Sequence, residues 1–404
     1  MCSRQPGNRQ RFVYMLCLFL LCALALASCG SSQQNTATPT PVQALPTTQP
    51  TITISQADTT IGQLIQRQSF SGSILVASHG NILLDKGYGM ADWQRKLKNA
   101  PQTQFAIGDM TKAFTATAIL MLQQQGKLNV QDSVCKYISG CPATWQPITI
   151  QMLLTNTSGI ARQFSQADLQ ATLALPLTPD RNITYIKKQP LDSPPGAAFT
   201  YNTPAFIVLG TLIQVVSGQS YADFVRQHML QPLHMSHTVV VDSEAAASQL
   251  TDLATGYQSW QQPASVGNLD FLSVYAPAIG IVSTVEDLYR WNQALTAHTL
   301  LSAQSVQHMF TDYVKTDVNG GCIFFVPMST TGTCPDYGLG WSVGKEAGHT
   351  VDEIAGYFTG YLCYMQRFPD DQYTIIVLTN QQNSDLSTIS PTLESVMFHL
   401  TQSL

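Results

Sequence analysis

The sequence carries little charge and no basic cluster. Only 11% of its 404 residues are Asp, Glu, Lys or Arg, the formal net charge is -5, and no run of Lys and Arg occurs. Proteins that bind nucleic acid concentrate basic residues on one surface, so no nucleic-acid partner is expected. The chain also lacks a GxxxxGK phosphate loop, a GxSxG turn and a zinc-type spacing of Cys and His. We therefore expect no metal and no cofactor.

Long hydrophobic runs are lacking too, apart from one at the N-terminus. Three arginines in the first 11 residues precede an apolar stretch at 12–27, which is shorter than the ~20 residues of a transmembrane helix. This pattern is typical of a signal peptide. The sequence LASC at 26–29 resembles a bacterial lipoprotein box, so we expect a lipid on Cys29. An ordinary secretory signal is the alternative.

Residues 30–50 contain almost nothing that a folded core could bury. They are mainly Ser, Gln, Asn, Thr, Ala and Pro, the composition of an extended, disordered linker. We predict a signal peptide at 1–28, a tether at 29–52 that begins with the lipidated cysteine, and one domain at 53–404. The domain would be secreted and held by its lipid on the outer face of the bacterial cytoplasmic membrane, or elsewhere in the envelope.

Secretion would place the remaining cysteines in an oxidising compartment. Cys135 and Cys141 bracket a short segment, and Cys322 and Cys334 bracket a Gly- and Thr-rich excursion. Each pair is expected to form a short-loop disulfide. Cys363 lies in an apolar stretch and is expected to be a buried free thiol.

Hydrophobic periodicity predicts a sheet made from both ends of the chain around a helical middle. Residues 71–89 alternate around a His-Gly-Asn turn, which is typical of a hairpin. Further strands are expected at 338–343, 356–365 and 373–378, and helices at 110–125, 205–216, 283–291 and 390–400. This order predicts an α+β domain with a helical lobe inserted into a sheet lobe.

The most informative segment is FAIGDMTKAFTATAILML at 105–122. Its helix is apolar on nearly every side and must be buried. Asp109 is expected to be the helix N-cap, Lys112 follows one turn later on the same face, and Gly126 ends the helix. A lysine at the start of such a helix is badly placed for solubility and indicates chemistry or its remains.

The chain resembles the serine β-lactamase-related family in segments that occur in the family's order. They are FSGSILVASHGNILLDKGYGMAD, FAIGDMTKAFTATAILMLQQQGKL, ITIQMLLTNTSGI, FTYNTPAFIVLG, STVEDLYRW, YGLGW and TIIVLTN. The family includes class C β-lactamases, D-alanyl-D-alanine peptidases, penicillin-binding proteins and related esterases. The resemblance runs from about residue 61 to the C-terminus. It implies an antiparallel sheet flanked by terminal helices, a helical lobe and a cleft between them.

The resemblance also implies three motifs: a serine with a lysine one turn later, a Tyr-x-Asn element, and a strand with Lys or His, any residue and Gly. The serine attacks a carbonyl carbon, and the lysine and tyrosine transfer its proton. In this chain Asp109 occupies the serine position and Lys112 is retained. Tyr201 is retained as well, but Thr203 stands where the asparagine belongs.

The third motif is displaced in this chain. Counting back from Gly356 places it at Thr350-Val351-Asp352, and one inserted residue would move it to His349-Thr350-Val351. In both registers the motif's glycine is replaced by a larger side chain. The acidic residues at 352 and 353 are expected to be solvated.

An aspartate at position 109 changes the expected chemistry. Its carboxylate lies within ion-pair reach of Lys112, so the lysine is expected to stay charged and unable to act as a base. The sequence therefore predicts a catalytically degenerate module that binds a small acyl or peptidoglycan-peptide ligand. The alternative is an active β-lactamase, carboxypeptidase or esterase that uses another hydroxyl, with Thr111, Ser158 and Ser283 as candidates.

Overall fold

The computed structural model describes residues 54–67, 69–162, 179–259, 262–265, 272–273, 275–316 and 334–400. The predicted signal peptide, the lipid site at Cys29, the tether and Cys322 lie outside these residues. Residues 50–404 form one compact unit.

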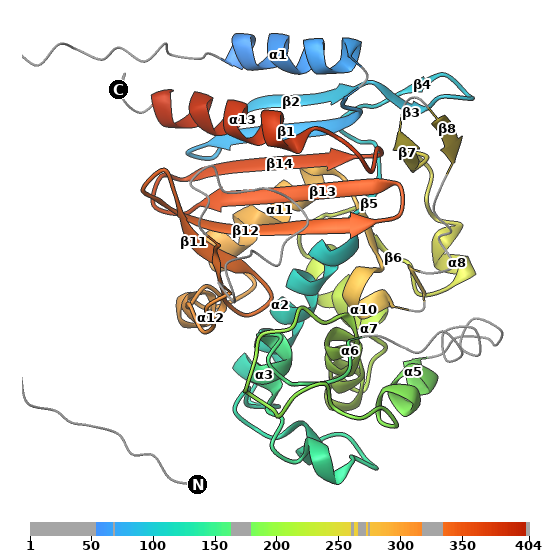
Figure 1. Ribbon diagram of the computed structural model, residues 1–404, viewed down its shortest axis with the longest axis vertical. Helices are drawn as coiled ribbons and strands as arrows, with labels where there is room; N and C mark the ends of the chain where they lie inside the picture. Colours follow the sequence, from blue (N-terminus) through green and yellow to red (C-terminus); the bar gives the residue numbers. More distant parts are fainter. Residues whose placement is uncertain are drawn as a thin grey trace, which may run out of the picture. The chain divides into compact units, whose positions relative to one another are not determined.

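A seven-stranded antiparallel sheet organises this unit (Figure 1). Its strand order is β10-β11-β12-β13-β14-β1-β2, so the N-terminal hairpin joins the C-terminal strands through β1 and β14. The strands are β1 (Gly72–Ser78), β2 (Asn81–Tyr88), β10 (Asp336–Tyr337), β11 (Ser342–Glu346), β12 (His349–Phe358), β13 (Tyr361–Phe368) and β14 (Tyr373–Thr379). The predicted α+β fold, with a sheet made from both chain ends, is confirmed.

One predicted strand was wrong in its bounds. The stretch 356–365 is not a single strand, because the chain turns between Phe358 and Tyr361 and pairs with itself, with Gly356 opposite Cys363. Apolar residues continue through the turn on both sides of a Thr-Gly pair. The hydrophobic pattern therefore hid the hairpin.

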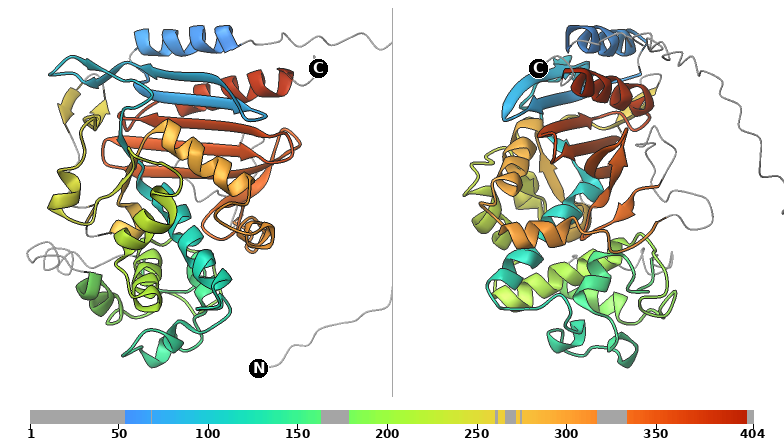
Figure 2. Two further views of the ribbon diagram at one scale, coloured as in Figure 1. Left: turned by 180° about the vertical axis from the view of Figure 1, so that it is seen from behind. Right: turned by 90° about the vertical axis from the view of Figure 1, so that its left-hand side faces the viewer.

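Both faces of the central strands are buried, which explains their continuous apolar sequence. Ile74 and Val76 of β1 share a core with α1 (Ile54–Gln66) and α13 (Leu386–Leu400). Leu75 and Ala77 of the same strand join the larger core on the other face. There α11 (Val285–Thr296) packs against β1 and β14, opposite α13 (Figure 2).

The helical lobe is built around α2 (Thr111–Gln124) and α6 (Thr203–Ser217), which pack against each other. The other α-helices are α3 (Ile150–Leu154), α5 (Pro179–Ile186), α7 (Tyr221–Val225), α8 (Glu244–Ala247), α10 (Ala276–Ile279) and α12 (Ala303–Met309). The 3₁₀ turns are Gly108–Met110 (η1), Val134–Lys136 and Ala143–Trp145, and a π-helical turn (η4) spans Arg226–Leu230. Short strand pairs are β3 (Met90–Asp92) with β4 (Leu97–Lys98), and β7 (Tyr257–Ser259) with β8 (Gln262–Ser265). A three-stranded sheet joins β5 (Phe105–Ala106), β9 (Ile281–Ser283) and β6 (Val239–Val240).

The described part of the chain shows neither a membrane-spanning helix nor a cluster of metal ligands. No single helix among the described residues is long and apolar enough to cross a membrane. The helical segments Thr203–Ser217 and Tyr221–Leu230 together have sufficient length and apolar composition, but they are bent by 74° relative to each other. No group of three or more His, Cys, Asp and Glu side chains among the described residues is arranged to hold a metal ion.

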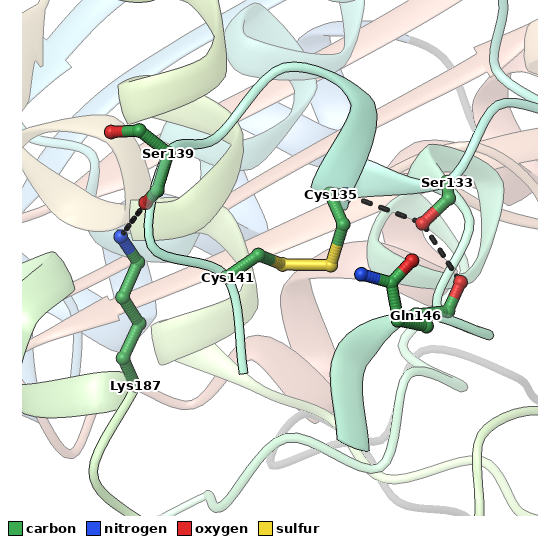
Figure 3. The surroundings of a disulfide bond; sticks show 6 residues. All are labelled: Ser133, Cys135, Ser139, Cys141, Gln146 and Lys187. Atoms are coloured by element: carbon green, nitrogen blue, oxygen red, sulfur yellow. Dashed lines mark hydrogen bonds between the residues drawn. A yellow bond between two sulfur atoms is a disulfide. The ribbon is translucent and has the colours of Figure 1, made fainter. Parts of the chain in front are cut away.

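The predicted disulfide between Cys135 and Cys141 is present in the helical lobe (Figure 3). The Ser133 hydroxyl accepts a hydrogen bond from the Cys135 N–H (3.3 Å) and donates one to the Gln146 carbonyl (2.8 Å). Within the bridged loop, the Ser139 carbonyl accepts a hydrogen bond from Lys187. Cys334 is also disulfide-bonded, while Cys363 is a buried free thiol, as predicted.

Removing the helical-lobe disulfide should lower stability moderately. We expect the double variant Cys135→Ser, Cys141→Ser to lose about 2 kcal/mol of unfolding free energy, because a short covalent loop restricts the unfolded chain only modestly. Urea denaturation of the oxidised proteins measures the change. Equal stability of the oxidised wild type and the variant would contradict this expectation.

Acidic side chains are buried on both faces of β12, contrary to the prediction that residues 352 and 353 are solvated: Glu353 lies on the face covered by α13, and Asp352 lies on the other face, 3.8 Å from Arg367. Asp352, Glu353 and Glu394 are each no more than 4% exposed. Burial raises the pKa of Glu353 to about 8 and that of Glu394 to about 6. The Gln366 amide donates a hydrogen bond to Glu353 (3.3 Å), which opposes the rise.

The elevated pKa of Glu353 predicts a pH-dependent stability. A carboxyl group whose pKa is raised on folding binds more protons in the folded state, so its contribution is present below the unfolded pKa near 4.5 and is lost as the pH rises towards 8. We expect wild type to lose at least about 1.4 kcal/mol, the value of one pKa unit, relative to Glu353→Gln between pH 5 and pH 8. Urea denaturation across this range measures the difference, and parallel pH profiles for the two proteins would contradict it.

Candidate functional site

Two glycines bring the start of the buried helix against the sheet. Gly108 in η1 has a φ of 52°, and a Cβ there would lie 2.3 Å from the Tyr357 carbonyl oxygen. A Cβ on Gly356 would lie 1.9 Å from the Ile107 carbonyl oxygen. Only residues without a side chain allow such an approach. Asp109, the middle residue of η1, is therefore held beside β12.

The sequence predicted that Asp109 is the N-cap of α2, and this prediction was wrong. The helix begins at Thr111, its N-cap position is Met110, and no side chain caps it. The Asp109 carboxylate instead forms an ion pair with the Lys112 ammonium. Asp109 lies in η1 and Lys112 in the first turn of α2, and residues three apart in continuous helical backbone lie on the same face.

Lys112 lies inside the protein with its ammonium among aromatic rings. Its side chain is 0% exposed, against 21% for Asp109. The Nζ atom lies 4.6 Å from the ring centroid of Tyr201 and 5.7 Å from that of Phe206. Burial lowers the pKa of Lys112, and the Asp109 carboxylate opposes this. The expectation that the carboxylate simply keeps the lysine charged therefore omitted the larger effect.

Tyr201 lies where the sequence placed it, beside the ion pair. Burial raises its pKa well above the usual value, and the negative charge of Asp109 adds to the effect. Its phenol is therefore a proton donor rather than an anion at neutral pH. The structure thus brings together the first-motif pair and the tyrosine of the second motif.

The rest of the second motif forms the N-terminus of α6. Thr203 is the first residue of α6, and Asn202 is its N-cap. The Asn202 side chain accepts a hydrogen bond from the Ala205 N–H (2.8 Å) and donates one to the Ile160 carbonyl. Among the described residues, no hydrogen bond joins Thr203 to Asp109 or Lys112.

The third motif lies further along β12 than the sequence predicted. Gly356 is the residue of β12 that lies against Ile107, directly before η1, so we assign it to the motif's glycine. The motif then reads Ile354-Ala355-Gly356, and Gly360, not Gly356, is the glycine that follows it. With this assignment the glycine is retained, and Ile354, which is 5% exposed, stands in the position of the cationic Lys or His.

His349 and Thr350 are accordingly remote from the site. They begin β12, and His349 is eight residues from Tyr357, roughly 26 Å along an extended strand. The His349 ring stacks on Phe398 with centroids 4.1 Å apart, and its Nδ1 lies 2.8 Å from an Asp371 carboxylate oxygen. Thr350 pairs with a residue of β11. Neither side chain can contact a ligand at Asp109.

Sequence reasoning missed Tyr337. This residue of β10 is 2% exposed, and its ring centroid lies 5.1 Å from that of Phe199 and 6.4 Å from that of Tyr201. Burial raises its pKa, and the Asp109 charge acts in the same direction. Tyr337 is part of the YGLGW segment that carried the family resemblance, but none of the three motifs includes it.

The hydroxyls of Thr111, Ser158 and Ser283, the alternative nucleophiles, form hydrogen bonds with other parts of the fold. Thr111 Oγ1 accepts a hydrogen bond from the Ile281 N–H (3.1 Å), and Ser158 Oγ accepts one from Ile160 (3.4 Å). Ser283 Oγ lies 2.8 Å from the Thr238 hydroxyl. All three side chains are at most 1% exposed. In the described part of the chain, none is hydrogen-bonded to Lys112.

The chain is similar to penicillin-binding proteins and their relatives. Residues 57–392 match the family model described as Beta-lactamase. Protein flp of Staphylococcus aureus (strain NCTC 8325 / PS 47) is 33% identical over 242 residues, which are 58% of this chain and 47% of flp. Putative penicillin-binding protein PbpX of Bacillus subtilis (strain 168) is 29% identical over 326 residues, which are 80% of this chain and 74% of PbpX.

A solved structure gives the same picture of the fold. The octameric penicillin-binding protein homologue from Pyrococcus abyssi has a TM-score of 0.69 at 23% identity, covering 87% of this chain and 77% of that chain. The chain spans about half the length of flp (47%) and about three quarters of the length of PbpX (74%). The family match nevertheless extends over most of the sequence, so the chain belongs to the Beta-lactamase family.

Proposed function

We propose that this protein is a lipid-anchored, extracytoplasmic member of the family that binds a ligand at Asp109 without forming an acyl-enzyme. The ion pair between Asp109 and Lys112 carries the proposal. Acyl transfer in this family needs a hydroxyl beside a proton acceptor. A carboxylate that attacked an ester or amide would produce a reactive anhydride, so it is a poor substitute.

The changes extend beyond one residue. Ile354 supplies no charge where the third motif has a cation, and Thr203 replaces the asparagine of the second. Since the other candidate hydroxyls are buried in structural hydrogen bonds, the whole site favours binding over turnover. The ligand class follows from the family: a small acyl compound or a peptidoglycan peptide.

The location is inferred from the N-terminal sequence. A lipid on Cys29 would hold the domain at the outer surface of the membrane through the predicted tether. The disulfide between Cys135 and Cys141 supports an oxidising compartment.

A fluorescent penicillin and a fluorophosphonate probe should therefore leave the purified domain unlabelled, as judged by gel fluorescence and intact mass. We expect Asp109→Ser to restore at most slow nitrocefin turnover, because residues 203 and 354 still depart from the motifs. Covalent labelling of wild type at any Ser or Thr would instead establish the active-hydrolase alternative. Rapid turnover by Asp109→Ser would show that only the nucleophile had been lost.

A further inference from the structure

The Asp109–Lys112 pair presents its negative member to solvent. The carboxylate is 21% exposed and the ammonium 0%. Lys112 contacts one carboxylate oxygen, Oδ1, and no hydrogen bond to Oδ2 is found among the described residues. A charged group of a ligand that approaches Oδ2 would therefore meet the negative carboxylate oxygen and not the buried ammonium of Lys112.

The described part of the sheet supplies no second cation to this oxygen. The strand position that carries Lys or His in the family motif holds Ile354, which is 5% exposed. Within the described residues, Lys112 is the one cation in ion-pair contact with Asp109. A ligand carboxylate would be repelled here, whereas a ligand cation would be attracted.

Aromatic rings next to the carboxylate favour the same kind of ligand. Phe199, Tyr337 and Tyr201 form a continuous series of ring contacts at 5.1 and 6.4 Å. Tyr201 already lies 4.6 Å from one ammonium, that of Lys112. Tyr337 and Phe199 are only 2% and 7% exposed and support the partly exposed ring of Tyr201, which is the ring a ligand would meet. Ring faces attract organic cations and also bury their apolar parts.

We propose that the ligand held at Asp109 carries a protonated amine beside an apolar group. Relative to the family motif, the site has exchanged a cation for a neutral side chain and a neutral hydroxyl for a carboxylate, so its charge preference is inverted. The inference rests on the proposed function, because a site that formed acyl-enzymes would need Lys112 for proton transfer. It extends that function by naming the chemical class of the ligand.

Three probes of similar size separate charge from shape: 2-phenylethylamine, 3-phenylpropionate and 3-phenylpropanol. By isothermal titration at pH 7 and low salt, we expect the amine to bind at least tenfold more tightly than the other two. Added salt should weaken the amine alone. Equal or tighter binding of the carboxylate, or no binding of the amine up to tens of millimolar, would overturn the inference.

Two variants locate the effect. Asp109→Asn should reduce the preference for the amine to less than about threefold. Asp223→Asn, which removes the carboxylate of another i,i+3 ion pair at an exposed position, should leave it unchanged. A preference that survives in Asp109→Asn would also overturn the inference. If this variant does not fold, the salt dependence of wild-type binding decides. Failure of the amine preference leaves the absence of acylation standing, since acylating probes test that separately.

Discussion

The Gly356→Ala variant is expected to lose on the order of 4 kcal/mol of unfolding free energy or to fail to fold. The added Cβ would lie 1.9 Å from the Ile107 carbonyl oxygen and 3.0 Å from the Met110 side chain. Overpacking a core usually costs about 1–3 kcal/mol. Here the nearest atom belongs to the backbone of the segment that leads into η1, which cannot rotate away, so the cost should exceed that range.

Thermal and urea unfolding measure this effect, and the chain offers a matched control. Gly62 lies in α1, and a Cβ there would meet nothing within 4 Å. Gly62→Ala should therefore stabilise the protein by roughly 0.5–1 kcal/mol, through the higher helix propensity of alanine. A Gly356→Ala protein as stable as wild type would show that η1 does not pack on β12 as described.

Removing the carboxylate of the buried ion pair is expected to have the second-largest effect. Asp109→Ala leaves the fully buried Lys112 without a partner, and removing one partner of a buried pair costs about 3 kcal/mol or more. Lys112→Met should cost far less, because methionine fills a similar volume beside Tyr201 and Phe206 while the partly exposed carboxylate remains solvated. Urea denaturation of both variants measures the asymmetry.

The double variant Asp109→Ala, Lys112→Met tests the cause. It should recover most of the stability lost by Asp109→Ala, because the unpaired ammonium is gone, so the two changes are not additive. Asp223→Ala, at an exposed ion pair, should cost less than about 1 kcal/mol. Equal losses for Asp109→Ala and Lys112→Met would show that the pair has no such asymmetry.

The sequence predicted those parts of the fold that local pattern determines. The β1–β2 hairpin, α2 and α6 follow from apolar periodicity with turn or capping residues at their ends. The family resemblance supplied the spatial relation between Asp109, Lys112 and Tyr201. These three side chains lie together in the structure.

Long-range contacts account for what the sequence could not supply. The third motif was misplaced because Gly356 and Gly360 are equally plausible in a one-dimensional count, and only the contact of Gly356 with Ile107 distinguishes them. Asp109 was taken as a helix cap because its type and position suit one, although a 3₁₀ turn intervenes. Tyr337 acquires its place from its contacts with Phe199 and Tyr201, which no local pattern encodes.

The pairing of β1 with β14 has a consequence for biogenesis. The first strand of the sheet stays unpartnered on one edge until the last strand has left the ribosome. Contacts between residues so distant along the chain form late, because closing the long intervening loop costs conformational entropy. The apolar hairpin is therefore complete well before its second neighbour has been synthesised.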